Sequence, residues 1–338
     1  MLVEVAEYSI LAVIATVAIW KASSWLEQSS KRLSAYYGLP AIVQGAIVVA
    51  IGSSFPELAS VVISTWRHGT FDLGVSAIVG SAIFNLLVIP ALSGIFSDGV
   101  KADRSVVYKE AQFYMIAVSV LIITFAMAVI YYPVADMRLG GTVTWQLALI
   151  PIAFYGVYVF TQYQDTQDHD AEDAPEDINP AREWLMLLAS LILIAVAVEG
   201  LVEAALGFGE LFNTPNFIWG LTVIAAGTSL PDTLVSVRAA RESNGVTSLA
   251  NVFGSNVFDL LVAVPAGVLI AGSADIDFAV TVPMMGFLTL ATVVVFGFLR
   301  TELTLTKNES WGLLGVYGLF LVWMVFETAG VTNLVPGA

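Results

Sequence analysis

Ten separate runs of about 20 mostly apolar residues extend along the chain, and they constrain its fold more than any other feature. Several of the runs are almost free of charge; the stretches from Ala111 to Val134 and from Phe278 to Leu299, for example, contain no charged residue. A membrane-spanning helix needs about 20 apolar residues, whereas a barrel strand needs only about 10 with alternating polarity. The runs therefore predict an all-α polytopic membrane protein with ten transmembrane helices. They cover approximately residues 5–26, 41–66, 73–97, 110–132, 143–162, 184–206, 216–240, 246–273, 278–299 and 310–330.

The composition agrees with this class and argues against an enzyme. Of 338 residues, 58% are hydrophobic and 12% are charged, whereas about a quarter of the residues in a soluble domain are charged. The chain has no cysteine, which excludes disulfides, thiolate metal sites and cysteine nucleophiles. Its two histidines, His68 and His169, both lie outside the apolar runs. We therefore expect no catalytic residues and no resident cofactor.

The basic residues predict the orientation. If the N-terminus lies outside, the odd-numbered loops are cytoplasmic and the even-numbered loops contain only Arg67 and Arg138. Such a bias is typical of the cytoplasmic side of a membrane protein. It predicts a multi-pass protein of the plasma membrane with both termini outside. The eleven basic residues of the odd-numbered loops are Lys21, Lys31, Arg32, Lys101, Arg104, Lys109, Arg182, Arg238, Arg241, Arg300 and Lys307.

A polar segment divides the chain into two halves. Residues 163–181 carry seven acidic residues and no basic one, and their carboxylates lack the spacing of a calcium-binding loop. A solvated cytoplasmic linker is the simplest interpretation, because the segment has few apolar residues to bury. The predicted organisation is a first five-helix repeat at 1–162, the acidic linker at 163–183 and a second five-helix repeat at 184–338.

Two sequence motifs recur in the two halves. GSSFPEL at 52–58 aligns with GTSLPDT at 227–233, and IVGSAIFNLL at 78–87 aligns with VFGSNVFDLL at 252–261. The offsets, 175 and 174 residues, are nearly the same. Because each half has an odd number of predicted helices, the second repeat should be inverted in the membrane. Inverted repeats are typical of secondary transporters, whose substrate sites lie near the midplane between the repeats.

The motifs gather groups that offer oxygen atoms. Pro56 and Pro231 cannot donate backbone hydrogen bonds, so the carbonyls of Gly52 and Gly227 lose their helical partners. Each proline precedes an acid, Glu57 or Asp232. The hydroxyl, amide and further carboxyl groups of the motifs belong to Ser53, Ser54, Ser81, Asn85, Thr228, Ser229, Ser255 and Asp259. Ser81 and Ser255 follow Gly80 and Gly254, so small residues for close helix packing are the alternative interpretation there.

These groups suit hard cations. Oxygen-only sites favour ions such as Ca²⁺ and Na⁺, and no Lys or Arg lies within these helical cores to balance Glu57, Asp232 and Asp259. Each carboxylate costs on the order of 3 kcal/mol to insert at midmembrane, so a bound ion or protons must neutralise the three. One Ca²⁺ leaves a net charge of about −1, and three Na⁺ leave about zero. Competition between such cargoes for one site predicts exchange.

The repeated motifs resemble the two alpha repeats of the cation/Ca²⁺ exchanger superfamily, and most closely those of sodium/calcium exchangers. Asp232 and Asp259 resemble the potassium-dependent branch, although Asp259 alone does not establish potassium use. The resemblance implies that Glu57 and Asp232 are shared Ca²⁺ and Na⁺ ligands and that the other oxygen groups complete the cation sites. It also implies that the long first and sixth helices slide across the core to switch access. Ala82, opposite Asn256, departs from the symmetry of the repeats and suggests packing.

The sequence-based hypothesis is a secondary antiporter that exchanges Ca²⁺ for Na⁺. Alternatives are a proton/Ca²⁺ exchanger, a K⁺-dependent Na⁺/Ca²⁺ exchanger and, less well supported, a cation channel or an intramembrane metalloenzyme. The expected partners are Ca²⁺ and Na⁺ as cargo, with K⁺ or H⁺ left open, and the lipid bilayer. No nucleic acid and no obligate protein partner is expected.

Overall fold

The computed structural model describes residues 2–38, 50–135, 137, 139–165, 178–329, 331–332 and 334–335. Most of the predicted acidic linker, residues 166–177, and the start of the second apolar run lie outside the described residues. The helices are α1 (Leu2–Tyr36), α2 (Ala50–Ser53), α3 (Phe55–Trp66), α4 (Phe71–Ser97), α5 (Ala111–Tyr131), α6 (Trp145–Asp165), α7 (Pro180–Phe212), α8 (Asn216–Trp219), α9 (Ala225–Thr228), α10 (Leu230–Arg241), α11 (Gly245–Phe258), α12 (Val264–Ala271), α13 (Phe278–Arg300) and α14 (Lys307–Thr328).

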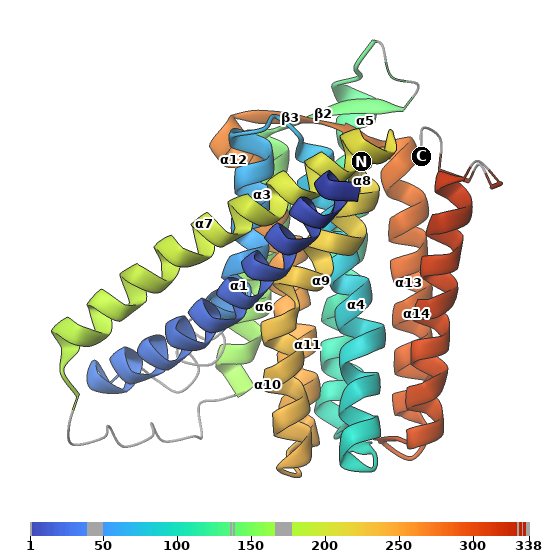
Figure 1. The fold of residues 1–338 in the computed structure, drawn as a ribbon. Helices are drawn as coiled ribbons and strands as arrows, with labels where there is room; N and C mark the ends of the chain where they lie inside the picture. The colour runs from blue at the N-terminus through green and yellow to red at the C-terminus, as the bar shows by residue number, and fades with distance from the viewer. Residues whose placement is uncertain are drawn as a thin grey trace.

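The described residues form a bundle of helices, as expected for an all-α membrane protein (Figure 1). Seven spans in this part of the chain are long and apolar enough to cross a membrane, and there are eight if the bent segment from α8 to α10 is one span. The run predicted at 143–162 is helical as α6, although it is not among these spans. The start of α1 and the end of α14 lie on the same side of the bundle (Figure 1).

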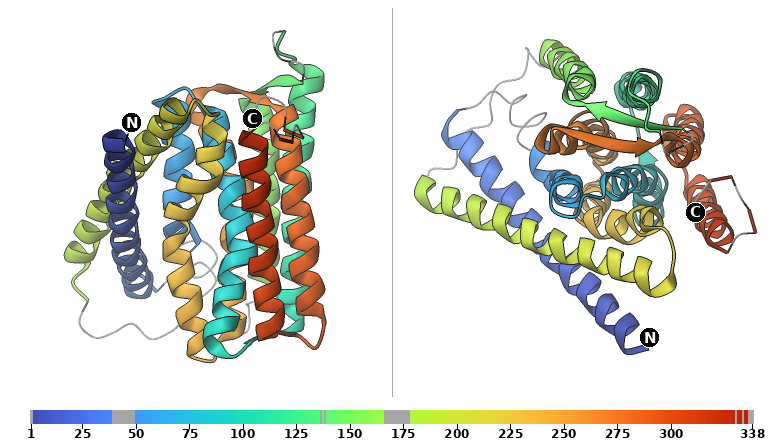
Figure 2. Two further views of the ribbon diagram at one scale, coloured as in Figure 1. Left: turned by 45° about the vertical axis from the view of Figure 1, so that its right-hand side comes forward. Right: turned by 90° about the horizontal axis from the view of Figure 1, so that it is seen from above.

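Helices α1 and α7 lie side by side and cross the rest of the bundle obliquely (Figures 1 and 2). They share an apolar cluster that includes Ile19 of α1 and Ile194, Val198 and Leu201 of α7. The outward faces of both helices carry large exposed apolar side chains, which suits contact with lipid. The pair therefore forms an oblique layer beside the main core, and residues of α3 and α4 join its apolar cluster.

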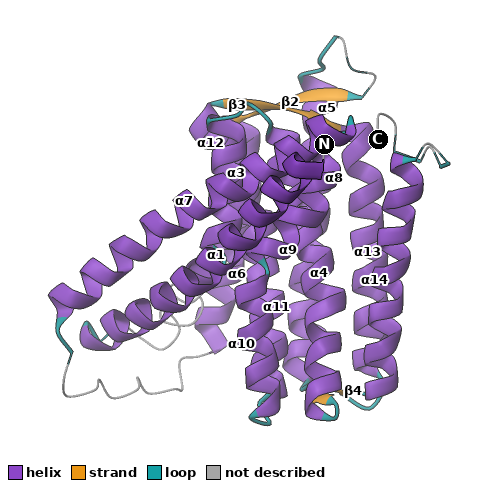
Figure 3. Cartoon of the chain, viewed as in Figure 1, coloured by secondary structure: helices purple, strands orange, loops and turns teal. Residues whose placement is uncertain are grey.

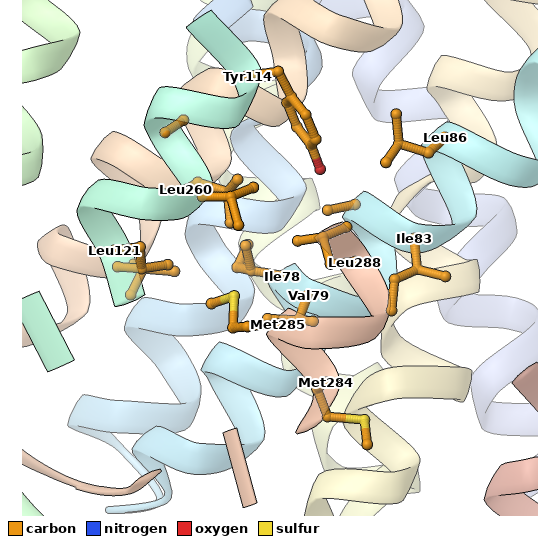
Figure 4. Packing of buried hydrophobic residues seen from close by; sticks show 14 of the residues in the cluster. Ile78, Val79, Ile83, Leu86, Tyr114, Leu121, Leu260, Met284, Met285 and Leu288 are labelled. Carbon is orange, nitrogen blue, oxygen red and sulfur yellow. The ribbon is translucent and has the colours of Figure 1, made fainter. Parts of the chain in front are cut away.

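The main core surrounds α4. Ile78, Val79, Ile83 and Leu86 of this helix are almost completely buried and pack with side chains of α5, α13 and the segment after α11 (Figure 4). A Cβ atom at Gly80 would lie 2.4 Å from the carbonyl oxygen of Leu221. Only glycine permits this close approach, because that distance is too short for a Cβ contact. Helix α4 thus holds the second motif of the first half against the second half of the chain.

Two short antiparallel sheets lie at opposite ends of the bundle (Figure 3). At one end, β2 (Gly140–Thr144) pairs with β3 (Ser273–Asp277). At the other end, β1 (Val100–Lys101) pairs with β4 (Thr304–Leu305). In each sheet one strand comes from the first half of the chain and the other strand comes from the second half. The sheets therefore join the two halves at both ends.

Both proline-containing motifs interrupt a helix. Ser54 separates α2 from α3, and Ser229 separates α9 from α10, where the helical segments meet at 47°. Pro56 and Pro231 are each the second residue after the interruption, a position at which proline fits because its missing N–H would have no helical partner. The motifs are therefore helix breaks, and their serines do not share one continuous helical face with the acids.

Three segments of the described chain are π-helical: η2 (Ser105–Glu110), η3 (Gly220–Ile224) and η4 (Asp259–Ala263). Segment η4 has a simple cause in the sequence. Pro90 follows Asn85 by five residues, whereas Pro265 follows Asp259 by six. A π-helical turn accommodates one extra residue within a helix, and such turns often occur at functional sites. Asp259 is the first residue of this widened turn.

Candidate cation site

Glu57 and Asp232 occupy equivalent positions. Each is the third residue of a helix that begins at a break, α3 for Glu57 and α10 for Asp232. The N-terminus of a helix carries a partial positive charge, which stabilises a carboxylate in the first turn. Both side chains are buried, with 1% and 2% of their surface exposed. The breaks therefore place two acids inside the protein, each in the first turn of a helix.

The second motif of each half supplies a continuous helix opposite a break. Ser81 and Asn85 lie on α4, Ser255 lies on α11 and Asp259 begins η4. All four side chains are buried. Helix α4 packs against α3 and α10, and η4 packs against α3. Each continuous segment thus lies beside a helix that begins at a break.

Hydrogen bonds join the motifs of the two halves. The Ser81 and Ser229 hydroxyl oxygens lie 2.7 Å apart. The side-chain amide of Asn85 donates to Oδ1 of Asn256 at 2.9 Å, and Asn256 donates in turn to the carbonyl oxygen of Ala82 at 3.3 Å. The repeated motifs, more than 140 residues apart in sequence, therefore meet at the centre of the molecule.

The three acids at this centre have neither a hydrogen-bond donor nor a basic side chain as a partner among the described residues. Both carboxylate oxygens of Glu57, Asp232 and Asp259 are buried and accept no hydrogen bond, and none of the ion pairs among the described residues involves them. The hydroxyls of Thr228, Ser255 and Ser54 lie beside Glu57, Asp232 and Asp259, respectively. The charge of Glu57 is near enough to those of Asp232 and Asp259 to interact with them. Buried carboxylates in this setting need a cation or protons.

The three acids are not drawn together as they would be around a bound metal. Across the ranges that the structure describes, no three Asp, Glu, His or Cys side chains are gathered closely enough to hold a metal ion by themselves. A cation here would therefore depend on the hydroxyl and carbonyl oxygens as well as on the carboxylates. Oxygen ligands of this kind suit Na⁺ and Ca²⁺.

A cavity of about 490 Å³ leads to one of the acids. It lies between α1 and α10, and Ser53 and Asp232 form part of its wall. Glu57 and Asp259 do not line it. The cavity therefore connects Asp232 with the end of the bundle at which α10 terminates.

The structure places most of the predicted residues at this centre. Gly52 and Gly227 are buried in α2 and α9, the short helices before the breaks, and Ser53 is half-buried. Asn256 was not among the predicted site residues, yet it bridges α4 and α11 through two hydrogen bonds. Its position directly after Ser255 in the second motif was the available signal. Residues brought together here are Ser54, Glu57, Ser81, Asn85, Thr228, Ser229, Asp232, Ser255, Asn256 and Asp259.

The chain is similar to known proteins over most of its length. The chain is 23% identical to the sodium/calcium exchanger MaX1 of Methanosarcina acetivorans, over 94% of this chain and 98% of the relative. It superimposes on the sodium-calcium exchanger NCX_Mj soaked with Na⁺ and Sr²⁺, with a TM-score of 0.61, 21% identity and coverage of 95% and 99%. For the H⁺/Ca²⁺ exchanger CAX, the TM-score is 0.73 at 13% identity, with coverage of 94% and 82%. These two structures support the fold alone.

A sequence model of one family matches almost the whole chain. Its description is "Sodium/calcium exchanger protein", and the match covers residues 8–164 and 182–326. These two ranges contain both breaks and both continuous segments of the centre described above. The chain therefore belongs to the sodium/calcium exchanger protein family, within the cation/Ca²⁺ exchanger superfamily.

Proposed function

We propose that this protein is a secondary antiporter that exchanges Ca²⁺ for Na⁺ by alternating access. The observation that carries the proposal is the group of three buried carboxylates, Glu57, Asp232 and Asp259, which have neither a hydrogen-bond donor nor a basic partner among the described residues. Uncompensated charge at this depth is expensive, so the protein is stable in the membrane only with cations or protons bound. The name of the relative MaX1 points to Na⁺ and Ca²⁺ as the two cargoes.

Charge balance supports competition between the cargoes. The three acids carry about −3 when ionised, which three Na⁺ neutralise and one Ca²⁺ reduces to about −1. Both cargoes need the same oxygens, so binding of one excludes the other. A conformational change that is slow when the site is empty and negative then couples their movement.

The architecture proposed for this mechanism is ten transmembrane helices arranged as two inverted five-helix repeats. Two observations support it: a helix break at the equivalent position of each half, and sheets at opposite ends that each pair a strand from one half with a strand from the other. We place the β1–β4 end in the cytoplasm, because Lys101 and Lys307 belong to it or adjoin it. Both termini then lie outside the plasma membrane.

Helices α1 and α7 are the proposed moving part. They contact each other closely, and most residues of their shared apolar cluster belong to these two helices, although α3 and α4 also contribute to it. Sliding of this pair across α3 and α10 would expose the acids alternately to the two sides. The individual ligands that we propose are those of the cation site described above, together with Gly52, Ser53 and Gly227.

The deciding experiment measures ⁴⁵Ca²⁺ uptake by liposomes that contain the purified protein. An outward Na⁺ gradient should drive uptake, with or without K⁺, whereas a pH gradient alone should not. Uptake that follows pH and ignores Na⁺ would establish proton/Ca²⁺ exchange instead, and dependence on K⁺ would establish the potassium-dependent type. Uptake without any counter-ion gradient, down the Ca²⁺ gradient only, would indicate a channel.

Substitution of the acids provides the residue-level test. Glu57→Gln and Asp232→Asn should each reduce Na⁺-driven uptake by about 100-fold or more, because a neutral amide can neither balance nor compete for the cation. Glu203→Gln is the matched control, since Glu203 is an exposed acid of α7. Its uptake should equal that of the unsubstituted protein. Normal uptake by a folded Glu57→Gln or Asp232→Asn variant would show that the proposed ligands are wrong.

A further inference from the structure

The cavity beside Asp232 contains a second acid that the cation site does not include. Glu27 of α1 lines this cavity, and its charge is near enough to that of Asp232 to interact with it. Its side chain is 21% exposed and pairs with Lys31 at 2.6 Å. The cavity, about 490 Å³, is large enough for an ion with its water shell, since a water molecule occupies about 30 Å³.

Ser23 supplies the independent observation. It lies one helical turn before Glu27, lines the same cavity and is 4% exposed, yet its hydroxyl has no hydrogen-bond partner among the residues that the structure describes. The adjacent Ser24 behaves in the usual way and donates to the carbonyl oxygen of Trp20 at 3.0 Å. A buried hydroxyl that does not bond to its own helix is available to a ligand in the cavity. Residues four apart on a helix share one face, so Ser23 and Glu27 can contact the same ion.

The basic residues of the cavity wall are engaged elsewhere. Arg238 binds Glu242 at 3.0 Å, and Arg241 lies over the ring of Phe96 at 5.0 Å. Arg238 is 81% exposed, so this part of the wall is the rim of the cavity. The charged side chains in the interior of the cavity are therefore acidic. Glu27 forms its ion pair with Lys31.

We propose that Ser23 and Glu27 form a second, weaker site for a hydrated cation, Na⁺ or Ca²⁺, at the cytoplasmic mouth of the path to Asp232. An arriving cation takes the place of Lys31 on Glu27 and uses the Ser23 hydroxyl as a further ligand. Water supplies its other ligands, because the protein offers only a few oxygens there. The role of the site in transport rests on the proposed function, whereas binding of the cation does not.

The transport test uses inside-out and right-side-out membrane vesicles. In inside-out vesicles, Glu27→Gln should raise the KM for Ca²⁺ roughly three- to tenfold and leave the maximal rate unchanged, as expected for the loss of one partly exposed charge. Lys31→Gln should lower the KM, because it removes the competing cation. Right-side-out vesicles should show neither change. A general loss of stability cannot raise the KM in one variant and lower it in the other on only one face of the membrane.

Two further variants complete the transport test. Ser23→Ala should raise the KM in the same direction as Glu27→Gln but less. Glu7→Gln is the control, because Glu7 is an exposed acid at the other end of α1, and it should change nothing. Equal KM values for Glu27→Gln and the unsubstituted protein, equal shifts on both faces, or shifts of the same sign for Glu27→Gln and Lys31→Gln would overturn the proposal.

A binding measurement separates this site from the transport mechanism. In detergent, the Asp232→Asn protein should still broaden the ²³Na resonance, and the Asp232→Asn/Glu27→Gln protein should broaden it less. Added Ca²⁺ should reverse the broadening if both cations use the site, whereas no reversal would restrict the site to Na⁺. Broadening that depends on Glu27 supports the site even if the unsubstituted protein shows no exchange, and broadening independent of Glu27 contradicts it.

Discussion

Gly80 and Gly254 hold equivalent places in the two copies of the second motif, but their surroundings differ. A Cβ at Gly80 would lie 2.4 Å from a backbone oxygen of Leu221, whereas a Cβ at Gly254 would meet, of the described residues, only the Tyr158 hydroxyl at 3.6 Å. The first contact is too short and the second is an ordinary van der Waals distance. Repeat symmetry in the sequence therefore does not imply equal packing requirements at equivalent residues.

This asymmetry predicts different effects of one substitution. Gly80→Ala should destabilise the protein by about 1–3 kcal/mol, because α4 must move away from the backbone of η3. Gly254→Ala, its matched control, should be nearly neutral. Thermal unfolding in detergent, followed by loss of the monodisperse chromatographic peak, measures the difference. Equal stability of the two variants would contradict the close approach seen at Gly80.

At this scale, the sequence predicted the types of residue better than their contacts. The sequence alone indicated Glu57, Asp232 and Asp259 as candidate ligands, since acids within apolar runs are rare and demand an explanation. The hydrogen bonds of Asn256 could not be predicted from the sequence, because they connect residues 171 and 174 positions apart. Ser23 was missed for a similar reason: a serine in an apolar helix usually bonds to its own backbone, and only the structure shows that Ser23 does not.

At the scale of elements, the π-helical turn η4 distinguishes the second motif of the second half of the chain from its counterpart in the first half. Helix α4 passes from Asn85 to Pro90 without such a turn, and its equivalent carries one more residue between Asp259 and Pro265. The π-helical turn accommodates that extra residue, so the helical segments before and after it keep the same rotational orientation about the helix axis. Unlike the proline breaks, which the sequence predicts from chemistry, η4 is visible only when the two repeats are compared residue by residue.

Deletion of a single residue tests the role of η4. Deleting Val264 should restore an ordinary helix like α4, so the protein should still fold. Because the backbone around Asp259 changes, Ca²⁺ exchange should slow by about tenfold or more. A tenfold change corresponds to ~1.4 kcal/mol of activation free energy. Deleting Ile89 from α4 is the control. Since no π-turn exists there to absorb the change, the helix beyond the deletion must rotate by about 100° and the fold should be lost. Chromatography and ⁴⁵Ca²⁺ uptake report the two outcomes; unimpaired exchange without Val264 would assign η4 to packing only.

At the scale of the whole molecule, the two halves interlock. Their motifs meet at Ser81 and Ser229, and each small sheet contains one strand from each half. The apolar runs predicted a polytopic helical membrane protein correctly. The sheets were not predicted, since strands of two to five residues leave little pattern in a sequence and their partners are distant.

Interlocking predicts that the halves assemble without a covalent link. Chains 1–170 and 171–338, produced together, should co-purify and retain a substantial part of the exchange activity, because the contacts between halves lie in the core and the sheets. Each chain produced alone should aggregate or be degraded, since its strands lack partners and its apolar core surface is uncovered. Affinity purification through a tag on one half measures the association. Two halves that purify independently as stable monomers would contradict this arrangement.

The crosswise pairing of strands also bears on the history of such a chain. In the proposed inverted arrangement, a protein only one half long would leave its two strands unpaired, one on each side of the membrane. A second copy inserted in the opposite direction would satisfy both strands at once. An ancestor of half this length would therefore have worked as a pair of oppositely oriented copies, and gene fusion would have made that orientation permanent.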